Sequence, residues 1–415
     1  MTVVRGYRPS FVLRTLLTTG ILFAASTQLR LSDFPPELRE QAAEVEKARQ
    51  SYPDNPCVLY QLAALYAKAS RTDEALAALR EMASKGSGVD PRLRDGFQSL
   101  AANAEFLRLK QRIRHDNPPV LHAHAAFTIA EADLIPEGIA WSEKQQRFYL
   151  GSVKRKVIEV DSQGRARDFV PAAADGLGVV VGLRVDDARG ELWAASEHMA
   201  PHPGLVRGIF RYRLRDGKLI AKYPVREGEA DLVNDLVVAP DGTLYATASN
   251  SGSLVMVRPG SPSAEVFLAP HSLPDPNGIT VSWDGRFLFV AGWYGITRVD
   301  LRTKDMLLLK SSPQIAAGCF DGLYEYEGDL VGIQNCVHDT GRVLRLRLNP
   351  SRDTIVSAQV LESYNPLFDG ITTGCIARHQ FYFMANTQFR KMGAGGTIPA
   401  NVSFEPIQVL RLDLE

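Results

Sequence analysis

The chain has 415 residues, with 47 Lys and Arg against 47 Asp and Glu and a pI near 7.1. This balance leaves no overall field to hold a nucleic acid or an acidic membrane surface, so we expect neither as a partner. The length exceeds that of one ordinary domain, and the residue pattern divides the chain into three parts, 1–30, 31–118 and 121–415.

Residues 1–30 are typical of a targeting segment. Arg5, Arg8 and Arg14 precede the apolar run LLTTGILFAAS, which ends in small residues, as a secretory signal does. The run is shorter than the roughly 20 residues that a comfortable membrane-spanning helix needs. We therefore predict an exported protein, periplasmic or extracellular, whose N-terminus is either cleaved or kept as a membrane anchor.

Residues 31–118 have a helical period, which is clearest in LYQLAALYAKASRTDEALAALREMASKG. Leu59, Leu62, Tyr66, Leu79 and Met82 stand at the spacings of one tetratricopeptide-like repeat. One such repeat cannot bury its apolar face alone. The region is thus expected either to pack on the rest of the chain as a cap or to offer a surface to a protein partner.

Between 121 and 415 one pattern occurs six times: a turn centred on a small residue, an apolar run, a polar turn and a second apolar run. The copies begin about 43 to 53 residues apart, which is the period of propeller blades. A third and often a fourth short run follow each pair, and Asp-Gly, Glu-Gly or Arg-Gly turns join them. The sequence predicts an all-β six-bladed propeller, preceded by a small α-helical domain and closed by residues 125–132 as the last blade's fourth strand.

The residue just before each turn is expected to lie at one mouth of the central tunnel. In chain order these residues are Glu137, Val181, Asn234, Asn277, Asp321 and Asp369. Five of the six offer oxygen, and oxygen ligands suit a hard cation such as Ca²⁺. Asn-Gly and Asp-Gly are also ordinary turn pairs, but Glu137 and Asn234 do not fit that explanation.

The ordered set of PEG in the first copy, ND in the third, PNG in the fourth and DG in the fifth resembles the senescence-marker-protein/gluconolactonase family. Paraoxonases and diisopropylfluorophosphatase share that family's architecture. The resemblance covers about residues 125–414 and implies one divalent cation in the tunnel, usually Ca²⁺, with Zn²⁺, Mn²⁺ or Mg²⁺ as alternatives. It implies four metal ligands: Glu137, Asn234, Asn277 and Asp321.

This resemblance implies a metal-dependent hydrolase of a small-molecule lactone or related ester, in which Asp321 acts as base or nucleophile. Leu232 and Val233 stand where sugar lactonases carry a basic residue, which argues against a sugar-acid lactone. The expected substrate-binding side chains are His198, Asp235, Trp293, Asn335 and Asp369, with His202 as a second histidine. The alternative is a non-catalytic propeller that binds a ligand or protein and holds a structural ion.

Two further features leave alternatives open. The Gly-rich stretch 388–406 is expected to be either a lid over the tunnel or a surface insertion. The four cysteines lack zinc-site spacing. Export would permit a disulfide that the sequence cannot assign, whereas Cys319 and Cys375 are expected to be buried small hydrophobes.

Overall fold

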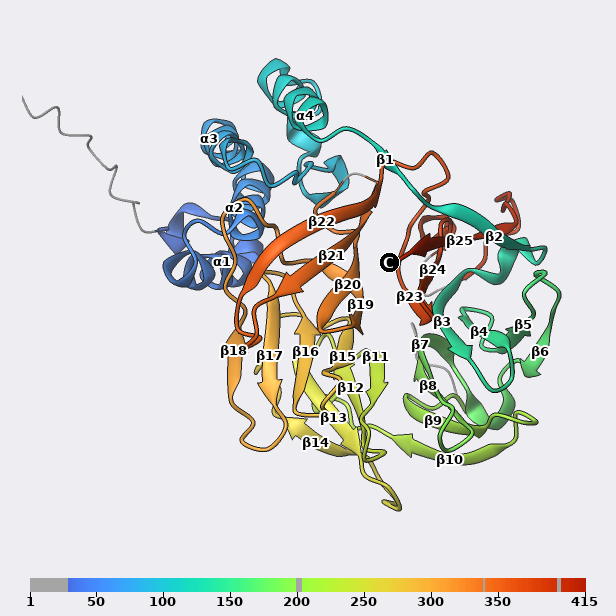
Figure 1. Ribbon diagram of the computed structural model, residues 1–415. Helices are drawn as coiled ribbons and strands as arrows, with labels where there is room; N and C mark the ends of the chain where they lie inside the picture. Colours follow the sequence, from blue (N-terminus) through green and yellow to red (C-terminus); the bar gives the residue numbers. More distant parts are fainter. Residues whose placement is uncertain (1–28, 199–203, 339, 394–396) are drawn as a thin grey trace, which may run out of the picture.

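The computed structural model describes residues 29–198, 204–338, 340–393 and 397–415. Six antiparallel sheets stand in a ring, so the predicted six-bladed propeller with an N-terminal helical region is confirmed (Figure 1). The predicted targeting segment lies outside the described residues up to residue 28. Among the residues described, no helix has the length and apolar character needed to cross a membrane.

Each blade has four strands that run outward from the tunnel in chain order, except that β2 forms the outermost strand of blade six. Blades one and two consist of β3 (Pro136–Ser142), β4 (Arg147–Ser152), β5 (Val157–Val160), β6 (Ala166–Val170), β7 (Val179–Asp186), β8 (Glu191–Glu197), β9 (Gly208–Arg213) and β10 (Leu219–Pro224). Blades three and four consist of β11 (Val233–Val238), β12 (Leu244–Ala248), β13 (Ser253–Val257), β14 (Glu265–Leu268), β15 (Ile279–Val281), β16 (Phe287–Ala291), β17 (Ile296–Asp300) and β18 (Met306–Leu308). Blades five and six consist of β19 (Phe320–Tyr326), β20 (Asp329–Gln334), β21 (Arg342–Leu348), β22 (Ile355–Ser363), β23 (Gly374–Ala377), β24 (Gln380–Met384), β25 (Ile407–Asp413) and β2 (His124–Ile129).

The ring closes as the sequence predicted. Strand β2 pairs antiparallel with β25, with Ile129 opposite Ile407, so the two ends of the propeller share blade six. Phe148 and Leu150 of blade one pack in one core cluster with Val409 of blade six. This packing buries the seam between the first and last blades and leaves no long unpaired edge there.

The connection between the helices and the propeller is also hydrogen-bonded. Strand β1 (Val120–Leu121) pairs with β22 as a fifth strand of blade five. The buried carboxylate of Glu362 then accepts the backbone N–H groups of His122 and Ala123, both at 2.7 Å. The chain therefore enters the propeller along a fixed path.

The helical region contains α1 (Arg39–Ser51), α2 (Pro56–Lys68), α3 (Thr72–Ser84) and α4 (Ala104–Asp116). Helix α2 begins at Pro56, and the Asn55 side chain caps it by accepting from the backbone N–H groups of Cys57 and Val58. Most of α2 is buried, because α1 and α3 pack against it and the propeller covers its remaining surface. The assignment of α2 and α3 to a tetratricopeptide-like repeat stays a prediction.

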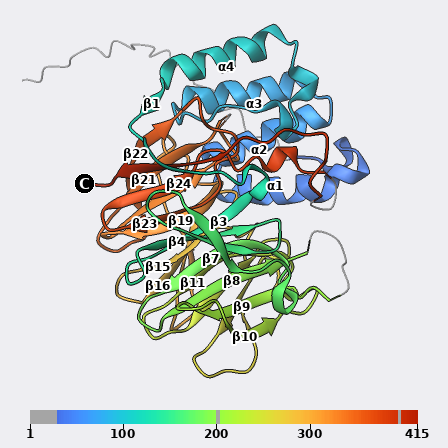
Figure 2. The same cartoon turned by 90° about the vertical axis from the view of Figure 1, so that its right-hand side faces the viewer.

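The helical region packs on the tunnel mouth, by which we mean the end where the first strand of each blade begins. Its core cluster includes Ala316, Cys319 and Val337 of the loops around blade five. Asn55 donates to the carbonyl of Tyr294 in the β16–β17 loop at 2.8 Å. Figures 1 and 2 show α1–α4 stacked beside blades four and five, so the structure has the helices in the cap position.

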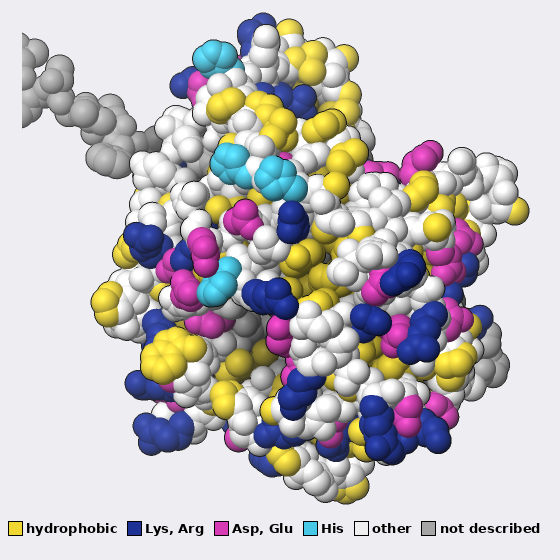
Figure 3. Space-filling model, turned by 45° about the vertical axis from the view of Figure 1, so that its right-hand side comes forward, with side chains coloured by type: hydrophobic (Ala, Val, Ile, Leu, Met, Phe, Trp, Pro, Cys, Tyr) yellow, Lys and Arg dark blue, Asp and Glu magenta, His cyan; other side chains and the backbone are white. Residues whose placement is uncertain are grey.

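Charged side chains are mixed on the surface. On the face shown in Figure 3, Lys and Arg are interspersed with Asp and Glu. This distribution agrees with the equal numbers of the two kinds in the sequence.

Candidate active site at the tunnel mouth

Three of the predicted ligands lie where strand pairing is interrupted. In blade one Pro136 pairs with Ser152 and Ile139 with Leu150, so Glu137 and Gly138 are skipped. Asn234 in β11 and Asp321 in β19 occupy the same kind of irregularity. Such bulges re-aim side chains, and here they free these residues from the pleat of the sheet at the tunnel mouth.

The small residue after each ligand is required by close packing between blades. A Cβ added to Gly138 would lie 2.6 Å from the carbonyl oxygen of Val181, and one added to Gly278 would lie 2.2 Å from that of Asp321. No side chain fits at such distances. Neighbouring first strands therefore touch backbone to backbone and bring the ligands together around the axis.

Blade three departs from this rule because Asp235 replaces the glycine. Its carboxylate accepts the backbone N–H groups of Leu236 at 2.8 Å and Ile279 at 3.1 Å, and it faces the Arg184 guanidinium at 3.5 Å. Asp235 therefore links blades three and four. The carboxylate of Asp235, a predicted substrate-binding residue, is thus engaged in contacts within the protein.

The carboxylates of Glu137 and Asp321 lie close enough to repel each other. Burial raises the pKa of Glu137 well above its usual range, and repulsion from Asp321 and Asp235 adds to this effect. Burial likewise raises the pKa of Asp321 to about 7, although a hydrogen bond from Asn335 opposes the shift. In the described part of the chain, neither carboxylate has a Lys or Arg partner.

Amide side chains surround these carboxylates. Asn234 donates its Nδ2 to Ser249 at 3.0 Å, which leaves its Oδ1 available. Asn335 donates to Asp321 Oδ2 at 2.6 Å, and the Asn277 side chain also hydrogen-bonds to Asp321. The donor set contains only oxygen, as a hard cation requires.

Blade six differs from the sequence-based alignment. Because Gly374 pairs with Phe383 and the β23–β24 turn is short, Thr372 and not Asp369 occupies the position equivalent to Glu137. The Thr372 carbonyl accepts from the backbone N–H of Gly322 at 3.1 Å, which places this residue in the ring of first strands. Asp369 lies outside that ring, and its carboxylate pairs with Arg390.

Thr372 is the site residue that sequence reasoning missed. Its hydroxyl is buried and has no hydrogen-bond partner among the described residues. The Asp-Gly pair at 369–370 concealed it, although counting back from the β23–β24 turn would have found it. A buried hydroxyl without a partner at the mouth points to a ligand or water there.

The remaining candidates lie at the edge of the site. His198 is half-buried just after β8, while His202 falls in a stretch that the structure does not describe. Trp293 packs against the helical region and hydrogen-bonds to Asp275. Of the predicted substrate-binding side chains, Asn335 is the one that bonds directly to a predicted ligand.

The stretch 388–406 also lies against the mouth. Its described residues Phe389, Met392, Ile398 and Phe404 pack on an apolar cluster formed by Ile135, Val153, Val179 and Val181. The mouth is thus flanked by this stretch over blades one and two and by the helical region over blades four and five. At this mouth Asp321 and Asn234 are each only 9% exposed.

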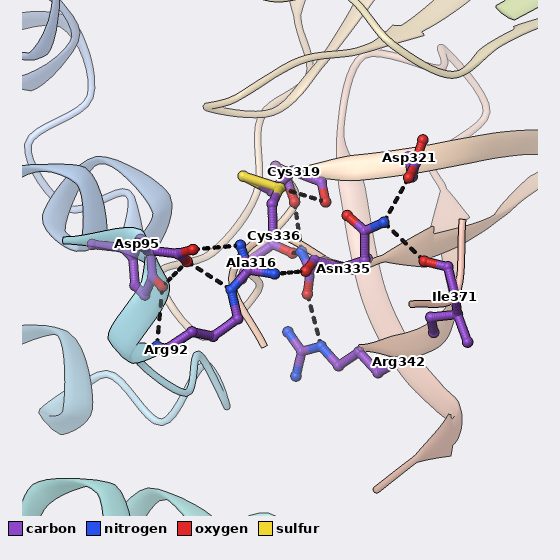
Figure 4. The surroundings of a disulfide bond; sticks show 12 residues. Arg92, Asp95, Ala316, Cys319, Asp321, Asn335, Cys336, Arg342 and Ile371 are labelled. Carbon is purple, nitrogen blue, oxygen red and sulfur yellow. Dashed lines mark hydrogen bonds and ion pairs between the residues drawn. A yellow bond between two sulfur atoms is a disulfide. The ribbon is translucent and has the colours of Figure 1, made fainter. Parts of the chain in front are cut away.

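The cysteine expectation is corrected at the same place. Cys319 forms a disulfide with Cys336, with their Cα atoms 5.4 Å apart, whereas Cys375 is buried and free as expected. The physical reason is the β19–β20 hairpin, in which Phe320 pairs with Gln334 and so brings the two flanking cysteines together. Figure 4 shows the disulfide beside Asn335 and Asp321.

The donor set fits a divalent cation only if amides take part. Across the described ranges, no three His, Cys, Asp or Glu side chains are grouped to hold a metal ion. The predicted set meets this limit, since it contains two carboxylates and draws its other oxygens from Asn234 and Asn277. Two carboxylates without a Lys or Arg partner among the described residues are consistent with such an ion. The buried Thr372 hydroxyl, which has no hydrogen-bond partner among the described residues, is consistent with it as well.

The fold resembles several solved propellers. A gluconolactonase of Xanthomonas campestris has a TM-score of 0.49 at 18% identity, covering 71% of this chain and 93% of that chain. A putative gluconolactonase scores 0.47 at 15% identity, covering 70% and 92%. Virginiamycin B lyase from Staphylococcus aureus scores 0.45 at 16% identity, covering 62% and 79%. No family model and no curated protein matches the sequence, so membership of the senescence-marker-protein family stays a prediction and activity must be inferred from the site.

Proposed function

We propose that the protein is a divalent-metal-dependent hydrolase of a lactone or related ester. The observation that carries this proposal is the pair of carboxylates, the half-buried Glu137 and the buried Asp321, which share the tunnel mouth without a cationic side-chain partner in the described residues. Two carboxylates taken from water are costly unless a counter-charge joins them. A divalent cation supplies that charge.

In this proposal Glu137, Asn234, Asn277 and Asp321 hold the ion, most simply Ca²⁺. When bound, the ion stabilises the negative charge that develops on the carbonyl oxygen under attack. Asn335 donates to Oδ2 of Asp321 and Asn277 also hydrogen-bonds to this carboxylate, so its orientation is fixed. As a base, the Asp321 carboxylate would accept the proton of the attacking water and then return it to the ring oxygen as the C–O bond breaks. As a nucleophile, Asp321 would displace the ring oxygen to form an acyl bond, which water would then cleave.

The walls of the site favour a substrate with an apolar body. Val181 takes the blade-two position in the ring, and the apolar cluster with Phe389 and Met392 lies beside it. Leu232 and Val233 supply no charge where a sugar acid would need it. We therefore expect alkyl-substituted lactones or aryl esters to be better substrates than sugar lactones.

The test is hydrolysis of a panel of alkyl lactones, sugar lactones and aryl esters by the purified protein, with chelator and after Ca²⁺ add-back. We expect activity that chelator abolishes and Ca²⁺ restores, and that Asp321→Asn eliminates. Asp369→Asn is the matched control, because Asp369 carries the same group outside the ring and should keep full activity. Turnover that persists after complete metal removal would contradict the proposal.

The alternative of a non-catalytic propeller has one observation in its favour, which is the low exposure of Asp321 and Asn234. An ion enclosed in this way would stabilise the ring without meeting a substrate. Bound metal with no turnover on any member of the panel would favour this alternative.

A further inference from the structure

The amide of Asn335 joins blade five to blade six at the proposed metal site. Its Nδ2 donates to Asp321 Oδ2 at 2.6 Å and to the carbonyl of Ile371 at 2.8 Å. Ile371 directly precedes Thr372, the blade-six residue of the ring. One side chain therefore orients the Asp321 carboxylate and ties it to the neighbouring blade.

Two interactions, a disulfide and a hydrogen bond from the helical region, hold the backbone around Asn335 in place (Figure 4). The first is the disulfide, in which Cys336 directly follows Asn335 and Cys319 lies two residues before Asp321. It links the same two strand ends as the Asn335–Asp321 hydrogen bond. The second is Arg92 of the helical region, whose guanidinium donates to the backbone carbonyl oxygen of Asn335.

Arg92 is itself fixed. Its Nε and a terminal nitrogen both donate to the carboxylate of Asp95 at 2.7 Å, and the Tyr60 hydroxyl hydrogen-bonds to the same carboxylate. Only 10% of the Arg92 side chain is exposed. A guanidinium held in a bidentate pair has little freedom, so its other terminal nitrogen, Nη1, points at the backbone carbonyl of Asn335 with a defined geometry.

We propose that Asn335 is a positioning residue for Asp321 and is itself held by Arg92 and by the Cys319–Cys336 disulfide. Through Arg92 the helical region therefore contributes to the geometry of the site. This inference rests on the proposed function, because Asp321 is a proposed ligand. Partners of this kind orient ligand carboxylates, and their loss usually weakens metal affinity about 10- to 100-fold. Arg92 lies outside the ring, so its effect is exerted through Asn335.

The experiment measures Ca²⁺ affinity by titration calorimetry on the wild-type protein and on variants that remove either the Arg92 hydrogen bond or the disulfide. Arg92→Met should weaken Ca²⁺ binding by about 10-fold or more, and Arg92→Lys, which keeps a donor, should restore part of it. The double change Cys319→Ser and Cys336→Ser should weaken binding as well. If that variant does not fold, the wild-type protein reduced after folding provides the same comparison.

The control is Asn103→Ala, which removes the side-chain cap of α4 and loosens the helical region at a residue whose side chain hydrogen-bonds within that region. It should bind Ca²⁺ as the wild type does. Saturating Ca²⁺ should also recover the activity of Arg92→Met, which general unfolding would not allow. Equal affinity of Arg92→Met and wild type, or an equal loss in Asn103→Ala, would overturn the inference. A wild type that binds no divalent ion would instead show that the metal site itself is wrong.

Discussion

Replacing Asp321 with Asn should stabilise the metal-free protein more than it stabilises the Ca²⁺-bound protein. In the metal-free protein, burial raises the pKa of Asp321 from 3.8 to about 7. The folded state therefore binds this proton more tightly than the unfolded state does. Stability that the protonated carboxyl provides is complete below about pH 4 and is lost as the pH rises toward 7.

The size of this effect follows from the shift. A difference of about 3 pKa units corresponds to about 4 kcal/mol between the two protonation states. At pH 8 in chelator, Asp321→Asn should raise the free energy of unfolding by up to about 4 kcal/mol, and at pH 4 by almost nothing. With Ca²⁺ at 100 times its dissociation constant, the wild type gains about 2.7 kcal/mol that the variant lacks.

Urea unfolding followed by circular dichroism, at pH 4 and pH 8 with chelator or Ca²⁺, measures all these values. The Asp369→Asn variant, whose carboxylate is paired with Arg390 outside the ring, should follow the wild type in every condition. If Asp321→Asn is no more stable than the wild type at pH 8 in chelator, then the two carboxylates do not share a site without a counter-charge, and the reasoning fails.

Three other predictions concern the frame around the site. Loss of the Cys319–Cys336 bond should cost about 3 kcal/mol of stability, because the two cysteines are 17 residues apart and closing a loop of about that length has this effect; denaturant curves of oxidised and reduced protein test this, and coincident curves would contradict it. Glu362→Ala should leave two linker N–H groups without their acceptor and cost about 1 to 3 kcal/mol; hydrogen exchange should then quicken at both groups, and unchanged exchange would refute their assignment. Asn55→Ala removes the cap of α2 and its bond to Tyr294, so it should cost about 1 to 2 kcal/mol and speed proteolysis of the helical region, whereas an unchanged cleavage rate would argue against docking.

The propeller was predictable because its blades repeat. Each copy carries the same alternation and turns, so six weak signals support one another, and the incomplete last copy indicated the closing strand 125–132. The ring of Glu137, Asn234, Asn277 and Asp321 followed from the same alignment. The sequence alignment of blade six was wrong because the Asp-Gly pair at 369–370 matches the motif better than Thr372 does. Strand pairing gives the ring position to Thr372.

The contacts between the helical region and the propeller could not be predicted from the sequence. Asn55 meets Tyr294, and Arg92 meets Asn335, through single hydrogen bonds between residues more than 200 positions apart. No periodicity encodes such contacts. The disulfide becomes predictable once the strand register of β19 and β20 is known, because that hairpin brings the two cysteines together.

The most direct test of the metal site is the ion content of the purified protein, measured by elemental analysis and Ca²⁺ titration on the wild type, Asp321→Asn and Asp369→Asn. The account predicts one divalent ion per chain in the wild type and in Asp369→Asn, and none in Asp321→Asn. A wild type without a bound ion at millimolar Ca²⁺, or an Asp321→Asn variant that binds as tightly, would contradict it.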